Sequence, residues 1–133
     1  MAGGRKIVSG LEEMKKVLYD AYGILARRFD TLIIPSEKFS GKPQPEETRP
    51  GVYVFWTPLK GVIKVGRSFD NSRKRALSHL PANTGGMVEI IQDQKAILYL
   101  FNPNDSKDLH LVAGLEVLFE IELDPLVLSK RLG

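Results

Sequence analysis

The chain has 133 residues, no cysteine and a formal net charge of +3. This length suits a single domain with a modest core, and the absence of cysteine excludes disulfides, thiol nucleophiles and thiolate zinc sites. No apolar run is long enough to span a membrane and no secretory pattern is present, so we expect a cytoplasmic protein without a membrane partner. The small positive charge is compatible with nucleic-acid binding without indicating it by itself.

The N-terminal part of the sequence predicts an amphipathic helix over about residues 10–29. Apolar residues recur there every three or four positions: Leu11, Met14, Leu18, Tyr22, Leu25 and Phe29. We expect this stripe to pack on the sheet of the same domain. A homodimer formed through this helix, or a face turned to DNA, remains an alternative use of the same stripe.

Two less regular segments follow the predicted helix. Residues 32–34 are Leu-Ile-Ile and indicate a short edge strand, ended by Pro35. Residues 36–50 are rich in proline, glycine and charge, which is typical of an extended loop. This loop serves either as a linker to the core or as a substrate-binding loop.

The central stretch, residues 49–80, predicts a strand, a turn, a second strand and a basic helix. The β-rich runs 52–57 and 62–66 are separated by Pro-Leu-Lys-Gly, a four-residue hairpin connection that ends at Gly61. The basic helix is expected over 72–80.

The expected hairpin register places several polar groups together. If Thr57 pairs with Val62, alternation puts one set of side chains on one face: Tyr53, Phe55, Val62, Lys64 and Gly66. A phenol and an ammonium would then lie diagonally across the hairpin, beside a glycine that leaves room for a ligand.

The basic helix contains three consecutive cations, Arg73, Lys74 and Arg75. They cannot share one face, because neighbouring positions on a helix are about 100° apart. Arg75 and His79 are four residues apart and do share a face. We expect Pro81 to end this helix.

The C-terminal third predicts one more strand and a long helix. Residues 96–101 form an apolar run that we interpret as a central strand buried on both faces, and residues 88–91 indicate a brief strand. Apolar residues between 111 and 123 predict a helix, and a short tail helix should follow Pro125 and run through Leu132. The expected fold class is therefore α/β (α+β), with an antiparallel sheet of about three strands flanked by helices.

The central stretch resembles the GIY-YIG nuclease family. Gly51-Val52-Tyr53 stands at the first family triplet and Lys64-Val65-Gly66 at the second, where lysine replaces the family's tyrosine. Arg75 and His79 match the family's arginine, which is followed four residues later by an aromatic residue or histidine. The spacing between the second triplet and the arginine is one residue longer than the family pattern, which leaves Arg73 as the alternative.

The resemblance also points to a metal-binding glutamate on the last helix. Leu115-Glu116, with Pro125 nine residues later, has the family's Leu-Glu form ahead of a proline. Glu116 also has apolar neighbours, where an unpaired carboxylate would be costly and a metal ion or cation would relieve that cost. Glu120, one turn further on, is the rival candidate.

This resemblance implies a metal-dependent endonuclease that hydrolyses DNA phosphodiester bonds. Tyr53 would act as general base or water positioner, Arg75 would bind the phosphate, and Glu116 would hold Mg²⁺ or Mn²⁺. Lys64 would lower the pKa of the phenol through its positive charge. His79 would orient a phosphate or shuttle a proton.

We expect DNA as the partner, with Arg67, Arg73 and Lys74 as further nucleic-acid contacts. Residues 1–48 should form the N-terminal helix and proline-rich loop packed on the core, and residues 49–133 the GIY-YIG-like catalytic domain, in one compact unit. Two alternatives remain: a nucleic-acid-binding module of the same fold that has lost cleavage, and a protein-interaction domain.

Overall fold

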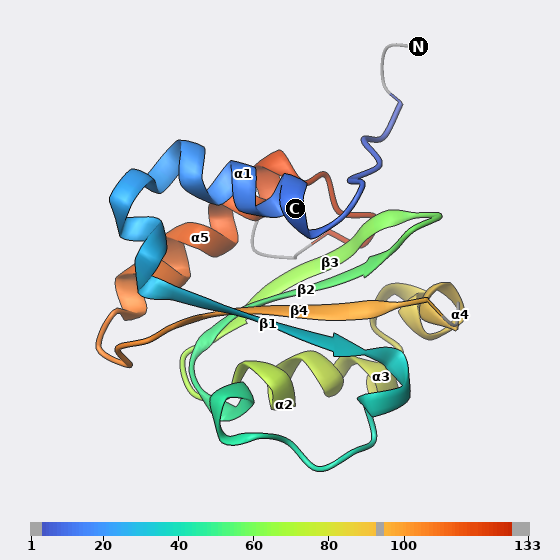
Figure 1. The fold of residues 1–133 in the computed structure, drawn as a ribbon. Helices are drawn as coiled ribbons and strands as arrows, with labels where there is room; N and C mark the ends of the chain where they lie inside the picture. Colours follow the sequence, from blue (N-terminus) through green and yellow to red (C-terminus); the bar gives the residue numbers. More distant parts are fainter. Residues whose placement is uncertain (1–3, 93–94, 129–133) are drawn as a thin grey trace.

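A four-stranded antiparallel sheet forms the centre of the molecule in the computed structural model, which describes residues 4–92 and 95–128 (Figure 1). The strands lie in the order β1-β4-β2-β3. Their bounds are β1 Phe29–Pro35, β2 Gly51–Thr57, β3 Gly61–Ser68 and β4 Ile97–Pro103. The predicted mixed fold class is confirmed, but the sheet has four strands rather than about three.

The additional strand is β1, which is longer than the predicted edge strand at 32–34. It pairs along its whole length with β4, from Phe29 opposite Pro103 to Pro35 opposite Ile97. β4 also pairs with β2 and is therefore internal, as the apolar run predicted. Because proline cannot donate to a neighbouring strand, Pro35 is tolerated at the end of an edge strand.

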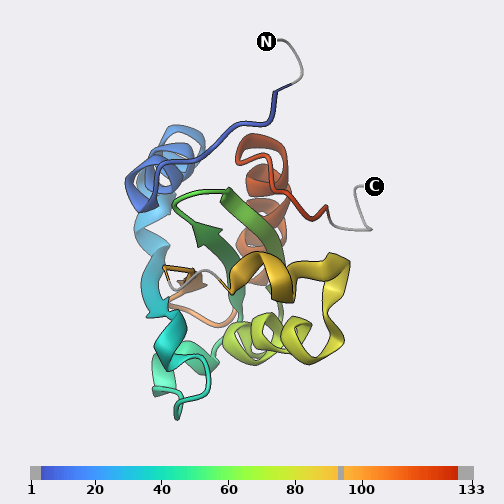
Figure 2. The ribbon, with the colours of Figure 1, turned by 90° about the vertical axis from the view of Figure 1, so that its right-hand side faces the viewer.

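Helices cover both faces of this sheet (Figures 1 and 2). α1 (Leu11–Tyr22) and α5 (Leu109–Glu122) lie on one face. α2 (Ser72–Leu77) and α3 (His79–Ala82) lie on the other. Each face encloses its own cluster of buried side chains. None of the helices within the described residues is long and apolar enough to cross a membrane.

The N-terminal helix is shorter than its apolar stripe predicted. α1 ends at Tyr22, and a 3-10 segment, Gly23–Arg28, turns the chain into β1. Gly23 has a φ of 56°, a left-handed conformation that ends a helix at little cost for glycine. Met14 and Leu18 are buried in the cluster between α1, α5 and the sheet, as the stripe predicted.

The hairpin register is as predicted beside the second triplet and differs near the turn. The expected pairs are present: Tyr53 with Gly66 and Phe55 with Lys64. Thr57 pairs with Gly61 instead of Val62, because the register shifts by one residue between Phe55 and Trp56. This bulge turns Val62 towards the α1/α5 face and places Ile63 in the other cluster. Val62 therefore does not share the face of Tyr53, contrary to the prediction.

The predicted basic helix is divided into α2 and α3. Pro81 has no N–H to donate to the carbonyl of Leu77, so the helix cannot run straight through. The break falls at Ser78, and α3 contains Pro81, so the prediction that Pro81 ends the helix is wrong. α3 ends where Asn83 adopts a φ of 48°. Asn71 caps the first turn of α2, with its Oδ1 accepting a hydrogen bond from the Lys74 amide at 2.9 Å.

Two C-terminal predictions are wrong in secondary structure. The run at 88–91 belongs to a short helix, α4 (Met87–Ile91), rather than a strand, since so short an apolar run fits either structure. No helix follows Pro125 within the described residues. Instead, the amides of Leu126 and Val127 donate to the carbonyls of Val62 and Ile63 on the edge of β3. Leu132 lies outside the described residues.

Gly51 provides a test of this packing. A Cβ at this position would overlap the Asn102 side chain and lie 2.8 Å from the Phe101 carbonyl oxygen. Asn102 is fully buried and ties α2 to the sheet, because its Oδ1 accepts a hydrogen bond from Ser72 Oγ at 2.9 Å. We expect Gly51→Ala to lower the free energy of unfolding by about 1–3 kcal/mol in urea denaturation.

The matched control is Gly41→Ala, where the nearest atom to a Cβ is a carbonyl oxygen at 3.3 Å, in the loop before β2. This variant should be clearly less destabilised. Equal losses in the two variants would contradict the role assigned to Gly51.

Candidate active site

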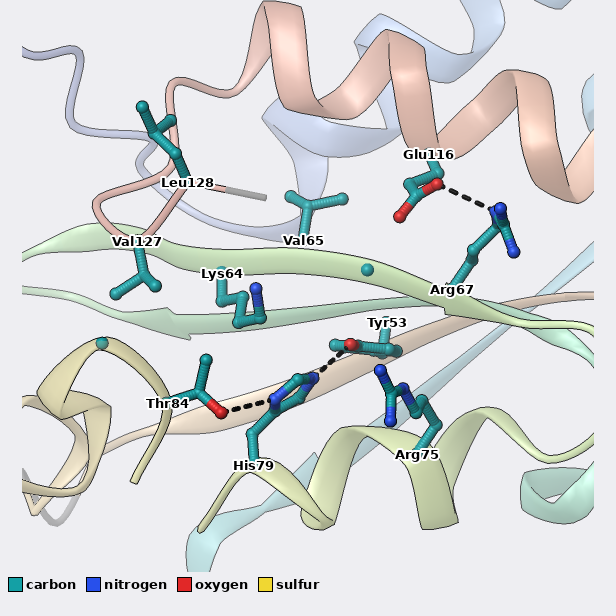
Figure 3. Close-up of a pocket in the computed structure, with 12 residues that line it drawn as sticks. Tyr53, Lys64, Val65, Arg67, Arg75, His79, Thr84, Glu116, Val127 and Leu128 are labelled. Atoms are coloured by element: carbon teal, nitrogen blue, oxygen red, sulfur yellow. Dashed lines mark hydrogen bonds and ion pairs between the residues drawn. The ribbon is translucent and has the colours of Figure 1, made fainter. Parts of the chain in front are cut away.

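A cavity of about 450 Å³ opens at the edge of β3, between that strand, α3 and α5 (Figure 3). Six residues of its lining have ionisable side chains and come from five separate elements: Tyr53, Lys64, Arg67, Arg75, His79 and Glu116. These include all five residues that the sequence proposed as catalytic. They meet because β3 is an edge strand, so side chains from both faces of the sheet can reach around it.

The position of Tyr53 depends on the glycine opposite. The two residues pair directly across the hairpin, and a Cβ at Gly66 would overlap the phenol ring. The ring therefore lies across the backbone of β3 and its hydroxyl reaches the cavity. Tyr53 is 2 % exposed, so its orientation is held by packing on all sides.

A hydrogen-bonded chain runs from Tyr53 through His79 to the loop after α3 (Figure 3). The Tyr53 hydroxyl lies 2.6 Å from His79 Nε2, and His79 Nδ1 lies 2.9 Å from Thr84 Oγ1. Burial, together with the positive charges of Lys64 and Arg75, lowers the pKa of His79 to about 4. The imidazole is thus neutral at pH 7, and the tautomer protonated at Nδ1 leaves Nε2 free to accept the phenol proton.

Lys64 lies on the same side of the hairpin and is 6 % exposed. Burial lowers the pKa of its ammonium, and the charge of Arg75 acts in the same direction. The carboxylates of Glu120 and Glu116 oppose this change without cancelling it. Lys64 is therefore easier to deprotonate than a surface lysine.

Glu116 forms a buried ion pair with Arg67. Arg67 Nε lies 3.0 Å from Glu116 Oε1, and the glutamate is 4 % exposed. The guanidinium of Arg67 also stacks on Phe69, 4.3 Å from the ring centroid. The cationic partner that the apolar surroundings of Glu116 require is thus present within the protein. Nothing in the sequence pattern indicated that Arg67 supplies it.

The residues present fit a magnesium ion held mainly by water and substrate. No group of three or more His, Cys, Asp or Glu that could cage a metal occurs in residues 4–92 and 95–128. Mg²⁺ keeps most of its water and needs only one or two carboxylates together with substrate phosphate. Glu116, a carboxylate on the wall of the cavity, matches that requirement. Glu120 lies one turn further along α5 and is 7 % exposed.

The structure places Arg73 away from the cavity. This residue is 8 % exposed, and its Nη2 donates to three carbonyls of the preceding loop, those of Lys38, Phe39 and Gly41. Its Nε lies 3.0 Å from Glu47 Oε1. Arg73 therefore anchors the proline-rich loop instead of facing a substrate. Lys74 is exposed and does not line this cavity; with Arg75 it lines a separate hollow beside α2.

Sequence reasoning missed two further parts of the lining. Thr84 holds the imidazole of His79 from a loop that showed only turn residues in the sequence. Val127 and Leu128 close one end of the cavity from the segment after α5 (Figure 3). No sequence signal links these positions to the hairpin, because their proximity arises only when the segment pairs with β3.

The lowered pKa of His79 gives a direct prediction. An NMR titration of the imidazole should show a midpoint near pH 4. A folded-state pKa below the ordinary 6.5 means that the unfolded chain binds the proton first. The stability contributed by neutral His79 is therefore present above pH 6.5 and is lost between pH 6.5 and 4.

This loss should amount to at most about 3 kcal/mol of the free energy of unfolding, and His79→Gln should remove it from the pH profile. The measurement is urea denaturation at a series of pH values. A His79 midpoint close to 6.5 would show that solvent reaches the imidazole.

Comparisons of the chain with known proteins found no match. No family model matches the chain, and no curated protein or solved structure matches it either. The resemblance to the GIY-YIG nuclease family thus stands on the two triplets, the helix that follows them and Glu116.

Proposed function

We propose that the chain is a metal-dependent endonuclease that hydrolyses DNA phosphodiester bonds in the cavity at the β3 edge. The observation that carries the proposal is the convergence of Tyr53, Lys64, Arg75, His79 and Glu116 on one cavity of about 450 Å³. These residues come from β2, β3, α2, α3 and α5. The resemblance assigns complementary roles to these same positions.

The acid–base part of the reaction belongs to Tyr53 and His79. Hydrolysis requires that a water molecule lose a proton as it attacks phosphorus. The Tyr53 hydroxyl can take this proton while it passes its own to His79 Nε2, 2.6 Å away. The low pKa of His79 keeps the imidazole neutral at pH 7, so Nε2 is open to the phenol proton, which a protonated imidazole could not accept. Activity should therefore decline as His79 becomes protonated.

The phosphate-binding part belongs to the cations around the cavity. Lys64, Arg67 and Arg75 line it, against one carboxylate, Glu116, so its lining carries excess positive charge. Arg75 lies on the exposed side of α2, where its planar guanidinium can bind two phosphate oxygens at once. This excess suits an anionic backbone and supports a nucleic-acid substrate.

Glu116 is the residue that would hold Mg²⁺. When bound, the ion supplies positive charge that stabilises the phosphoryl oxygens and the leaving group. Arg67 would then exchange part of its contact with Glu116 for contact with the substrate. The Arg67 guanidinium also stacks on Phe69, a contact that does not depend on Glu116.

One observation favours a second function, a DNA-binding module without cleavage. Arg67 already neutralises Glu116, so this carboxylate is satisfied without a metal ion. The decisive experiment incubates supercoiled plasmid with the protein and Mg²⁺. Conversion to nicked or linear DNA supports the endonuclease. Salt-sensitive binding without any conversion would favour the binding module instead.

Glu116→Gln should abolish plasmid cleavage while DNA binding remains, because the amide keeps the shape of the side chain but loses the charge that holds Mg²⁺. Titration with Mn²⁺ in the presence of uncleaved DNA should show the corresponding loss of metal binding. Glu120→Gln is the matched control on the same helix. Normal cleavage by Glu116→Gln would exclude this residue, and loss of cleavage in the control alone would make Glu120 the metal ligand.

Arg75→Ala and Arg73→Ala should affect different properties. Arg75→Ala should reduce the cleavage rate by about 10²–10³ with unchanged stability, as the loss of one preorganised donor to a developing charge typically does. Arg73→Ala should instead lower the free energy of unfolding by about 1–3 kcal/mol, since three loop carbonyls lose their common buried donor. The measurements are single-turnover cleavage and urea denaturation. A larger loss of cleavage rate in Arg73→Ala than in Arg75→Ala, with Arg73→Ala still stably folded, would show that Arg73 is the phosphate ligand.

A further inference from the structure

We propose that Lys64 is also an amine nucleophile, and that the same cavity cleaves DNA at abasic sites without a metal ion. The reaction would pass through a Schiff base between Lys64 Nζ and the aldehyde of the open-chain sugar. This inference rests on the nucleic-acid binding of the proposed function and is independent of its hydrolytic step.

The first support is the place of the amine. Lys64 is 6 % exposed, lines the cavity, and lies on the same side of β3 as Tyr53 and His79 (Figure 3). A lysine that only bound phosphate would gain little from burial, because removing an ammonium from water is costly. Burial and a neighbouring cation are the two conditions that activate a lysine amine as a nucleophile.

The second support is the set of groups that faces the amine. Burial and the charge of Arg75 lower the pKa of Lys64, while Glu116 and Glu120 of α5 act in the opposite direction. His79 of α3 and Tyr53 of β2 complete the surroundings within the cavity. The Tyr53–His79 hydrogen bond can give and take a proton, as imine formation requires.

The third support is the size and charge of the cavity. A volume of about 450 Å³ accommodates a sugar with its phosphates. A deoxyribose without its base is small, and turning it out of the duplex breaks no base pair. Arg67 and Arg75 can bind the phosphates on either side. These features favour a carbonyl carried on a DNA strand over a free aldehyde.

The proposed steps balance without an oxidant or reductant. Lys64 Nζ attacks C1′, and the carbinolamine loses water to form the C1′=N bond. A base, which the Tyr53–His79 pair provides, removes a proton from C2′. The electron pair forms the C2′=C3′ bond and expels the 3′-phosphate. Water then hydrolyses the imine, which releases the unsaturated aldehyde and regenerates the amine of Lys64.

The test is trapping with sodium cyanoborohydride, in EDTA, on a labelled duplex that carries one abasic site. Wild-type protein should form a covalent adduct that survives a denaturing gel, and peptide mass spectrometry should locate it at Lys64. Lys64→Arg keeps the positive charge and hydrogen-bond donors but cannot form an imine. It should lose the adduct even at protein concentrations that saturate the duplex, where wild-type protein forms it. Lys60→Arg, in the exposed hairpin turn, should form the adduct as wild type does.

An adduct that persists in Lys64→Arg, or one located at another amine, would overturn the inference. Absence of an adduct with wild-type protein would overturn it as well, whether or not the duplex is bound. Plasmid cleavage in Mg²⁺ separates the two proposals. Plasmid cleavage without a trapped adduct would support the endonuclease and exclude Lys64 as an amine nucleophile. A trapped adduct without Mg²⁺-dependent plasmid cleavage would support the role of Lys64 and exclude the endonuclease.

Discussion

The close approach of the Tyr53 ring to the backbone at Gly66 is the constraint on which the cavity depends. The β2–β3 register pairs these two residues, and only glycine leaves space for the ring. The phenol then lies over the edge strand, where its hydroxyl meets His79. A side chain at position 66 would displace the ring and separate this hydrogen-bonded pair. The last residues of the two triplets, Tyr53 on β2 and Gly66 on β3, thus pack directly against each other.

The second constraint is electrostatic. Three cations and a carboxylate share one partly buried cavity, and each charge would be costly there by itself. Arg67 balances Glu116 directly, while Lys64 is only partly compensated and has a lowered pKa. Burial, together with the charges of Lys64 and Arg75, lowers the pKa of His79 and keeps it neutral. The cavity therefore combines a neutral imidazole, an excess of cationic side chains and a lysine whose pKa is lowered.

The supporting structure around the cavity consists of buried polar contacts that join segments distant in sequence. Arg73 holds the proline-rich loop, and Asn102 links α2 to the sheet. The segment after α5 pairs with the first part of β3 and closes one end of the cavity. These contacts position α2, and with it Arg75, relative to the hairpin. Such positioning holds reactive groups in place better than a mobile loop would.

The sequence alone determined what depends on local pattern. Period-two alternation predicted the hairpin and the Tyr53–Gly66 pair, and helical spacing placed Arg75 and His79 on one side. Only the tertiary structure decided the bulge beside Val62, the helix at 88–91, the full length of β1, and the partners of Arg67 and Arg73. The reason is physical: alternation and helical spacing act between neighbours along the chain. The pairing of a buried charge, or of a short apolar run, depends on which distant segment packs against it.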